Sequence, residues 1–93
     1  MNLEHVKGKN CGKVVIYALS TCVWCKKTKK MLSDMGVDYY FVDVDLLDEI
    51  EQEEAQSEID KWNPSGSFPT VVIEDKDCIV GYNPEEMEKR LKK

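Results

Sequence analysis

The sequence contains no long apolar run, and this absence limits the class of protein. No stretch of its 93 residues approaches the roughly 20 consecutive apolar residues that a membrane-spanning helix needs. Residues 1–10 alternate polar and charged types, and they lack the apolar stretch and small residues of a secretory signal. We therefore expect a cytoplasmic protein that has no membrane partner.

Basic residues are outnumbered, with 13 Lys and Arg against 18 Asp and Glu and a net charge of -5. Binding to nucleic acid requires a basic surface, so we do not expect a nucleic-acid partner. Nine acidic residues fall between Asp43 and Asp60, which is typical of a solvated helix face. The exception to the acidic balance is a cluster of lysines beside two of the cysteines: Lys26, Lys27, Lys29 and Lys30.

Proline and glycine are scarce, at 3 and 5 residues, and they form no linker or low-complexity segment. A chain of this length supports one hydrophobic core. We predict a flexible lead-in over residues 1–12 and a single domain over residues 13–93.

Short apolar runs alternate with helical spacings along the domain. Strands are predicted at 13–18, 39–44, 70–73 and 78–80, and helices at 21–36, 47–62 and 83–91. A helix between the first two strands implies a parallel right-handed crossover, whereas the short turn at 74–77 implies an antiparallel hairpin. The predicted fold is α/β, with the order β-α-β-α-β-β-α around a four-stranded mixed sheet.

Cys22 and Cys25 lie where the first strand gives way to a helix that Ser20 or Thr21 could cap. Residues three apart in a helical turn are near enough to form a disulfide. The amides and the partial positive charge of a helix N-terminus stabilise a thiolate at Cys22, while Cys25 falls on the core-facing stripe. The pattern predicts a redox-active disulfide between Cys22 and Cys25, with Cys22 as the nucleophile.

A second interpretation of this motif is half of a zinc site, which would require two further ligands. Cys11, Cys78 and His5 are present, but each is isolated and no second paired spacing exists. We therefore expect no bound cofactor, and a zinc or iron-sulfur cluster binding module remains the alternative. Cys78 is interpreted as an ordinary apolar residue of a strand, and the role of Cys11 stays open.

From Lys13 to Leu91 the chain resembles the glutaredoxins and the related NrdH-type redoxins. The resemblance rests on Cys22-Val23-Trp24-Cys25, on Phe68-Pro69 and on Gly81-Tyr82-Asn83-Pro84. It implies a thioredoxin fold and a dithiol oxidoreductase that reduces protein disulfides, with a cis Phe68-Pro69 bond facing the thiols. The substrate-binding residues that it implies are Trp24, Phe68, Pro69, Gly81 and Tyr82, although Trp24 could equally serve packing.

Two departures from the glutaredoxin pattern bear on the electron donor. Many glutaredoxins carry a lysine three residues before the first cysteine and a Gly-Gly-x-Asp loop, which hold the two ends of glutathione. Here the same positions are Leu19 and Val80-Gly81-Tyr82-Asn83. The resemblance therefore implies a thioredoxin-reductase-like donor in preference to glutathione. By likeness to the NrdH-type redoxins it also implies ribonucleotide reductase as a candidate acceptor. We expect the protein to be a monomer.

Overall fold

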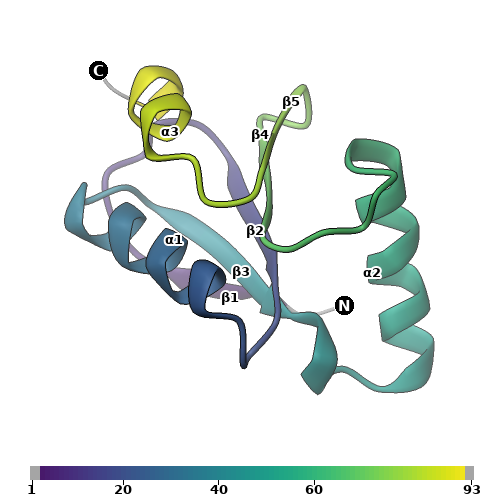
Figure 1. Ribbon diagram of the computed structural model, residues 1–93. Coiled ribbons are helices and arrows are strands. Elements are labelled where there is room, and N and C mark those ends of the chain that lie inside the picture. The colour runs from purple at the N-terminus through teal and green to yellow at the C-terminus, as the bar shows by residue number, and fades with distance from the viewer. Residues whose placement is uncertain (1–2, 92–93) are drawn as a thin grey trace.

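A computed structural model describes residues 3–91 of the chain. The described elements include five strands, three α-helices and one 3-10 turn (Figure 1). Their order is β1 (Glu4–Val6), β2 (Val14–Ala18), α1 (Val23–Asp34), β3 (Tyr39–Asp43), η1 (Val44–Leu46), α2 (Glu49–Trp62), β4 (Thr70–Ile73), β5 (Asp77–Val80) and α3 (Pro84–Leu91).

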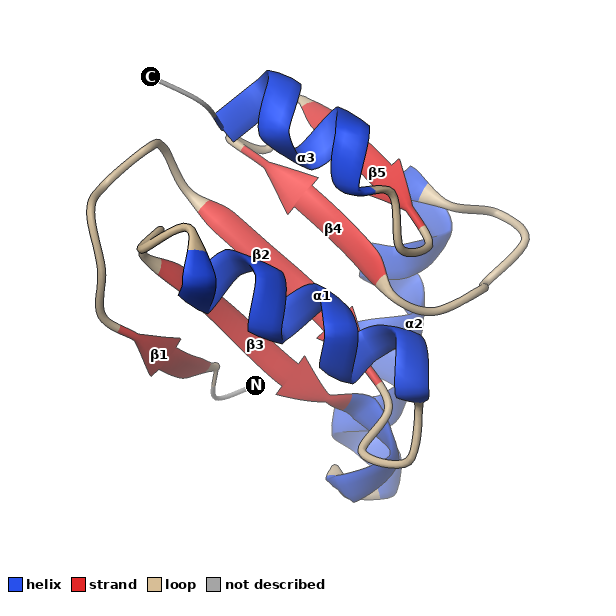
Figure 2. Ribbon diagram, turned by 60° about the vertical axis from the view of Figure 1, so that its left-hand side comes forward, coloured by secondary structure: helices blue, strands red, loops and turns tan. Residues whose placement is uncertain are grey.

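The strands form one mixed sheet in the order β1-β3-β2-β4-β5. Strands β2 and β3 are parallel, as the crossover through α1 requires, and all other neighbours are antiparallel. Helices α1 and α3 cover one face of the sheet and α2 covers the other (Figure 2). This is the thioredoxin-like α/β arrangement that the sequence predicted.

The predicted sheet of four strands is wrong by one strand. Residues 4–6 form β1, which pairs antiparallel with β3 so that Glu4 lies opposite Phe41. The expected boundary between a lead-in over 1–12 and a domain over 13–93 is therefore also wrong, because β1 belongs to the same sheet. Backbone pairing at a sheet edge needs no apolar run, and β1 is largely exposed, so its sequence carries only a weak strand signal.

The central strand β2 is buried along its whole length, as its continuous apolar run predicted. Side chains of a strand alternate between faces, so Val14 and Ile16 pack with α1 and α3. Val15 and Tyr17 pack with α2 on the opposite face. The chain thus forms two apolar layers, one on each side of a single sheet.

Helix α2 begins two residues later than the predicted range of 47–62. Asp48 caps it by accepting a hydrogen bond from the Glu51 amide at 2.8 Å. Leu47 consequently lies outside the helix, and Ile50 is 71% exposed and turned away from the core. The apolar positions early in this range are out of phase because they do not share a helical face with Ala55 and Ile59.

No helix within residues 3–91 is both long enough and apolar enough to cross a lipid bilayer.

Candidate active site

Cys22 is the N-cap residue of α1 and closes the turn that leaves β2. Its amide donates to the Leu19 carbonyl at 3.2 Å, and its sulfur accepts a hydrogen bond from the Cys25 amide at 3.2 Å. The cysteine sulfur therefore takes the place of the hydroxyl expected from Ser20 or Thr21. An amide donor and the positive end of a helix both face this sulfur, and both stabilise negative charge on it.

The two cysteines of the motif differ in accessibility. Cys22 is half-buried, whereas Cys25 is 0% exposed within the core between α1 and the sheet. Burial, and after it the hydrogen bond with the Cys22 side chain, raise the pKa of Cys25 to about 12. At neutral pH Cys25 is thus a protonated, inaccessible thiol beneath a reachable sulfur.

A groove next to the motif is lined by Trp24, Phe68, Gly81 and Tyr82 and has a volume of about 230 Å³. The rings of Trp24 and Tyr82 stack with their centroids 5.7 Å apart. Trp24 is 54% exposed, so it is not a core residue, although packing was one of its two interpretations. Four of the five predicted substrate contacts, which come from three distant segments, share this groove.

The fifth predicted contact, Pro69, is buried beside the groove. The Phe68-Pro69 bond is cis, as the resemblance implied. The Pro69 carbonyl accepts a hydrogen bond from the Gly81 amide at 2.8 Å, and Gly81 has a φ of +76° that favours glycine. This hydrogen bond joins the segment at 68–69 to the loop that carries Tyr82.

An aspartate that the sequence did not single out holds the turn before Cys22. Asp45 accepts hydrogen bonds from the Ser20 amide at 2.8 Å and from the Ser20 hydroxyl. The bonds from the hydroxyl and then from the amide lower the pKa of Asp45. Because β2 and β3 are parallel, their carboxyl ends meet at one edge of the sheet. The predicted parallel crossover could therefore have indicated that Asp45 lies near Ser20.

A second missed pair anchors α1 to the end of β3. Lys29 forms an ion pair with Asp43 at 2.8 Å, and the two side chains are only 20% and 19% exposed. The Lys29 ammonium also lies 4.0 Å from the centroid of the Phe41 ring. Lys29 is one turn after Cys25 on α1, so this contact fixes the helix segment that carries the buried thiol.

Cys11 and Cys78 lie away from the groove. Cys11 is in the loop before β2 and packs against the core on the α1 face. Cys78 lies on β5, and burial raises the pKa of its thiol. All four cysteines are free thiols.

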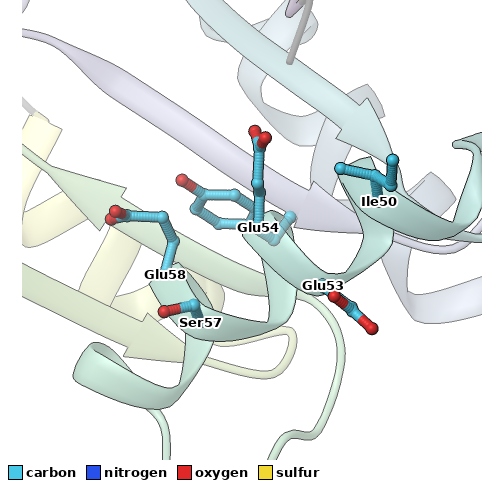
Figure 3. Close-up of a pocket in the computed structure, with 6 residues that line it drawn as sticks. Ile50, Glu53, Glu54, Ser57 and Glu58 are labelled. Carbon is cyan, nitrogen blue, oxygen red and sulfur yellow. The ribbon is translucent and has the colours of Figure 1, made fainter.

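A larger hollow, of about 690 Å³, lies over α2 and Tyr17 and contains none of the cysteines. Figure 3 shows the carboxylates of Glu53, Glu54 and Glu58 pointing in different directions rather than toward a common point. Within residues 3–91 no group of three or more His, Cys, Asp and Glu side chains is placed to hold a metal ion.

Comparison with known proteins identifies the family of this chain. A family model described as glutaredoxin matches residues 14–79. The chain belongs to the glutaredoxin family. A glutaredoxin-like 8.6 kDa protein of the rubredoxin operon of Clostridium pasteurianum is 36% identical over 80 residues, which are 86% of this chain and 99% of that protein.

Solved structures agree with this assignment. The glutaredoxin of Methanosarcina mazei Go1 matches with a TM-score of 0.92 and 50% identity, over 100% of this chain and 90% of that one. The NrdH-redoxin of Escherichia coli matches with a TM-score of 0.61 and 25% identity, over 83% of this chain and 92% of that one. The predicted resemblance and the thioredoxin-like fold are confirmed, and the family's general activity is thiol-disulfide exchange.

Proposed function

We propose that this protein reduces disulfides in protein substrates by exchange with the dithiol of Cys22 and Cys25. The observation that carries the proposal is the pairing of an accessible sulfur at the α1 N-cap with a fully buried thiol one turn later. The aromatic groove beside Cys22 supplies a surface on which a peptide segment of a substrate can lie.

The reaction follows from the different accessibility of the two sulfurs, because Cys22 is half-buried and Cys25 is fully buried. The Cys22 thiolate attacks one sulfur of the substrate disulfide, that S–S bond breaks, and the departing sulfur takes up a proton. Cys22 is then bound to the substrate in a mixed disulfide. Cys25 loses its proton and attacks the Cys22 sulfur, which releases the second substrate thiol and leaves a Cys22-Cys25 disulfide. Two electrons have passed to the substrate, and in the proposed step they come from the two cysteine sulfurs.

A thioredoxin-reductase-like enzyme, either a flavoprotein or an iron-sulfur protein, is the proposed donor that restores the dithiol. Leu19 packs against the core on the α2 face, at the position where a glutaredoxin lysine would hold glutathione. The side-chain oxygen of Asn83 lies 3.3 Å from the Glu86 amide as a cap of α3, so it is already engaged. The NrdH-redoxin of Escherichia coli is described as having a thioredoxin-like activity profile. A reducing, cytoplasmic setting and ribonucleotide reductase as one acceptor fit this donor.

A comparison of donors tests the proposal. The oxidised protein is incubated separately with a thioredoxin reductase plus NADPH and with millimolar glutathione, and free thiols are followed with time. We expect rapid reduction by the reductase and slow reduction by glutathione. Rapid reduction by glutathione together with no reaction with thioredoxin reductases would contradict the proposed donor.

The metal-binding alternative is tested by elemental analysis and the visible spectrum of the purified protein. A dithiol carrier is colourless, contains no stoichiometric metal, and loses two titratable thiols when Cys22 and Cys25 are oxidised. Stoichiometric zinc or iron that is lost in Cys22→Ser would favour the alternative.

A further inference from the structure

A second hollow adjoins the aromatic groove beside Cys22. It has a volume of about 470 Å³ and lies between α1 and α3, with Lys27, Lys30, Met31 and Met35 along the α1 wall. Tyr82 lines both this hollow and the aromatic groove, so the two depressions meet at that ring. We call the second hollow the α1–α3 groove.

The lining of the α1–α3 groove is basic at the end nearest the cysteine motif, where Lys27 lies, although the whole chain is acidic. The Lys27 ammonium lies 4.7 Å from the centroid of the Trp24 ring. Among residues 3–91 neither Lys26 nor Lys27 forms an ion pair, while Lys30 pairs with Asp34 at 2.9 Å. The acidic residues of the lining lie elsewhere: Asp34 is at the far end of α1, and Glu88 is on α3. The lining residue on the first turn of α1 after the motif is therefore Lys27.

The groove has the length and the surface for a short extended peptide. From Lys27 to Met35 the helix advances by about 12 Å, because each residue adds about 1.5 Å. An extended chain covers that distance with about four residues. The half-buried Met31 and Met35 offer polarizable apolar surface on the same wall, which suits varied apolar side chains.

We propose that the α1–α3 groove receives the extended segment next to the substrate cysteine and selects a segment with a carboxylate side chain facing Lys27. An apolar side chain of the same segment lies over Met31 and Met35. The inference rests on the proposed function and adds to it a preference for acidic sequence near the substrate disulfide. The exposed lysines act through long-range attraction and direct pairing, both of which weaken with salt.

Two sets of disulfide-bonded peptides test this preference. They are identical except for Glu or Lys at each of the three positions on either side of the cysteine. We expect wild-type kcat/KM to be about fivefold higher for the best Glu peptide than for its Lys counterpart, since exposed ion pairs are weak individually. The ratio should fall toward one in 0.5 M salt, and it should invert in the variant Lys27→Glu/Lys30→Glu.

The matched control is Lys61→Glu/Lys76→Glu, which changes the net charge equally but alters lysines on α2 and in the β4–β5 turn. This control should keep the wild-type ratio. Equal rates for Glu and Lys peptides, or a preference that survives Lys27→Glu/Lys30→Glu, would overturn the groove while leaving the proposed function in place. Failure to reduce any of the peptides through Cys22 would overturn the proposed function, and the groove with it.

Discussion

The two faces of the sheet carry helices of different chemistry. Helix α1 presents the cysteine motif, four lysines and an aromatic groove of about 230 Å³. Helix α2 presents a run of glutamates around a hollow of about 690 Å³, three times as large. The larger hollow is lined by no cysteine, and its carboxylates diverge, so cavity size alone would locate the wrong site. What marks a reactive site is the convergence of chemically matched groups from separate segments.

Removing the nucleophile should produce the largest difference in activity between a variant on the α1 face and a variant on the α2 face. Cys22→Ser replaces the sulfur nucleophile by an alcohol that does not attack disulfides, so reduction of a protein disulfide should fall to the uncatalysed rate. Glu53→Gln, on the larger hollow, should keep wild-type activity. The measurement is NADPH consumption in a coupled reductase assay, and comparable losses in the two variants would contradict the assignment.

The aromatic stack should have an intermediate effect on activity. Tyr82→Ala removes the ring that stacks on Trp24 and should lower kcat/KM for a protein disulfide by about three- to tenfold, the value of an aromatic pair. Tyr82→Phe keeps the stack and should retain most of the activity. Ile50→Ala is the matched change of an exposed apolar residue on α2, and an equal loss there would remove the distinction between the faces.

The ion pair beneath α1 should affect stability more than its counterpart on α2. Lys29→Ala leaves Asp43 largely buried without its partner, which we expect to cost about 1–2 kcal/mol of unfolding free energy. Lys61→Ala breaks the exposed pair with Glu58 and should cost less than about 0.5 kcal/mol. Urea unfolding measures both values, and a ranking in the opposite order would refute this account of the anchor.

Alkaline pH should lower the stability of the reduced protein because the Cys25 thiol is buried. The folded-state pKa of Cys25 is raised to about 12 from 9.0, so its contribution to stability is complete below pH 9 and is lost as pH rises toward 12. The reduced wild type should therefore lose more stability between pH 8 and pH 10.5 than reduced Cys25→Ala does. Tyr17 and Cys78 also have raised pKa values, but they are common to both proteins. Parallel pH profiles would contradict the burial of Cys25.

Sequence patterns predicted those parts of the molecule whose physics is local. The apolar run of β2, the hairpin after β4 and the capped start of α3 depend on neighbouring residues, and their predictions are close to the structure. Strand β1 could not be found in this way, because it is held by pairing with β3 more than thirty residues away. The late start of α2 likewise depends on how η1 turns the chain.

The residues of the candidate site also fall into those predictable from local sequence and those that depend on distant contacts. Cys22 and Cys25 are only three residues apart in sequence, so their chemistry follows from spacing and from the helix start. The positions of Phe68 and Tyr82 came from resemblance, and the structure brings them together in one groove. Asp45 and Lys29 were missed in these roles because their partners, Ser20 and Asp43, come from other elements. The parallel pairing of β2 with β3 brings Asp45 close to Ser20, whereas Lys29 on α1 meets Asp43 at the end of β3.

Trapping of a substrate by Cys25→Ser tests the central claim most directly. Without the resolving thiol, Cys22 should attack a protein disulfide and remain bound to it. Nonreducing mass spectrometry should then show one substrate per protein molecule, with the linkage at Cys22, and the double variant Cys22→Ser/Cys25→Ser should show none. No adduct in Cys25→Ser, or an adduct through Cys11 or Cys78, would contradict the account.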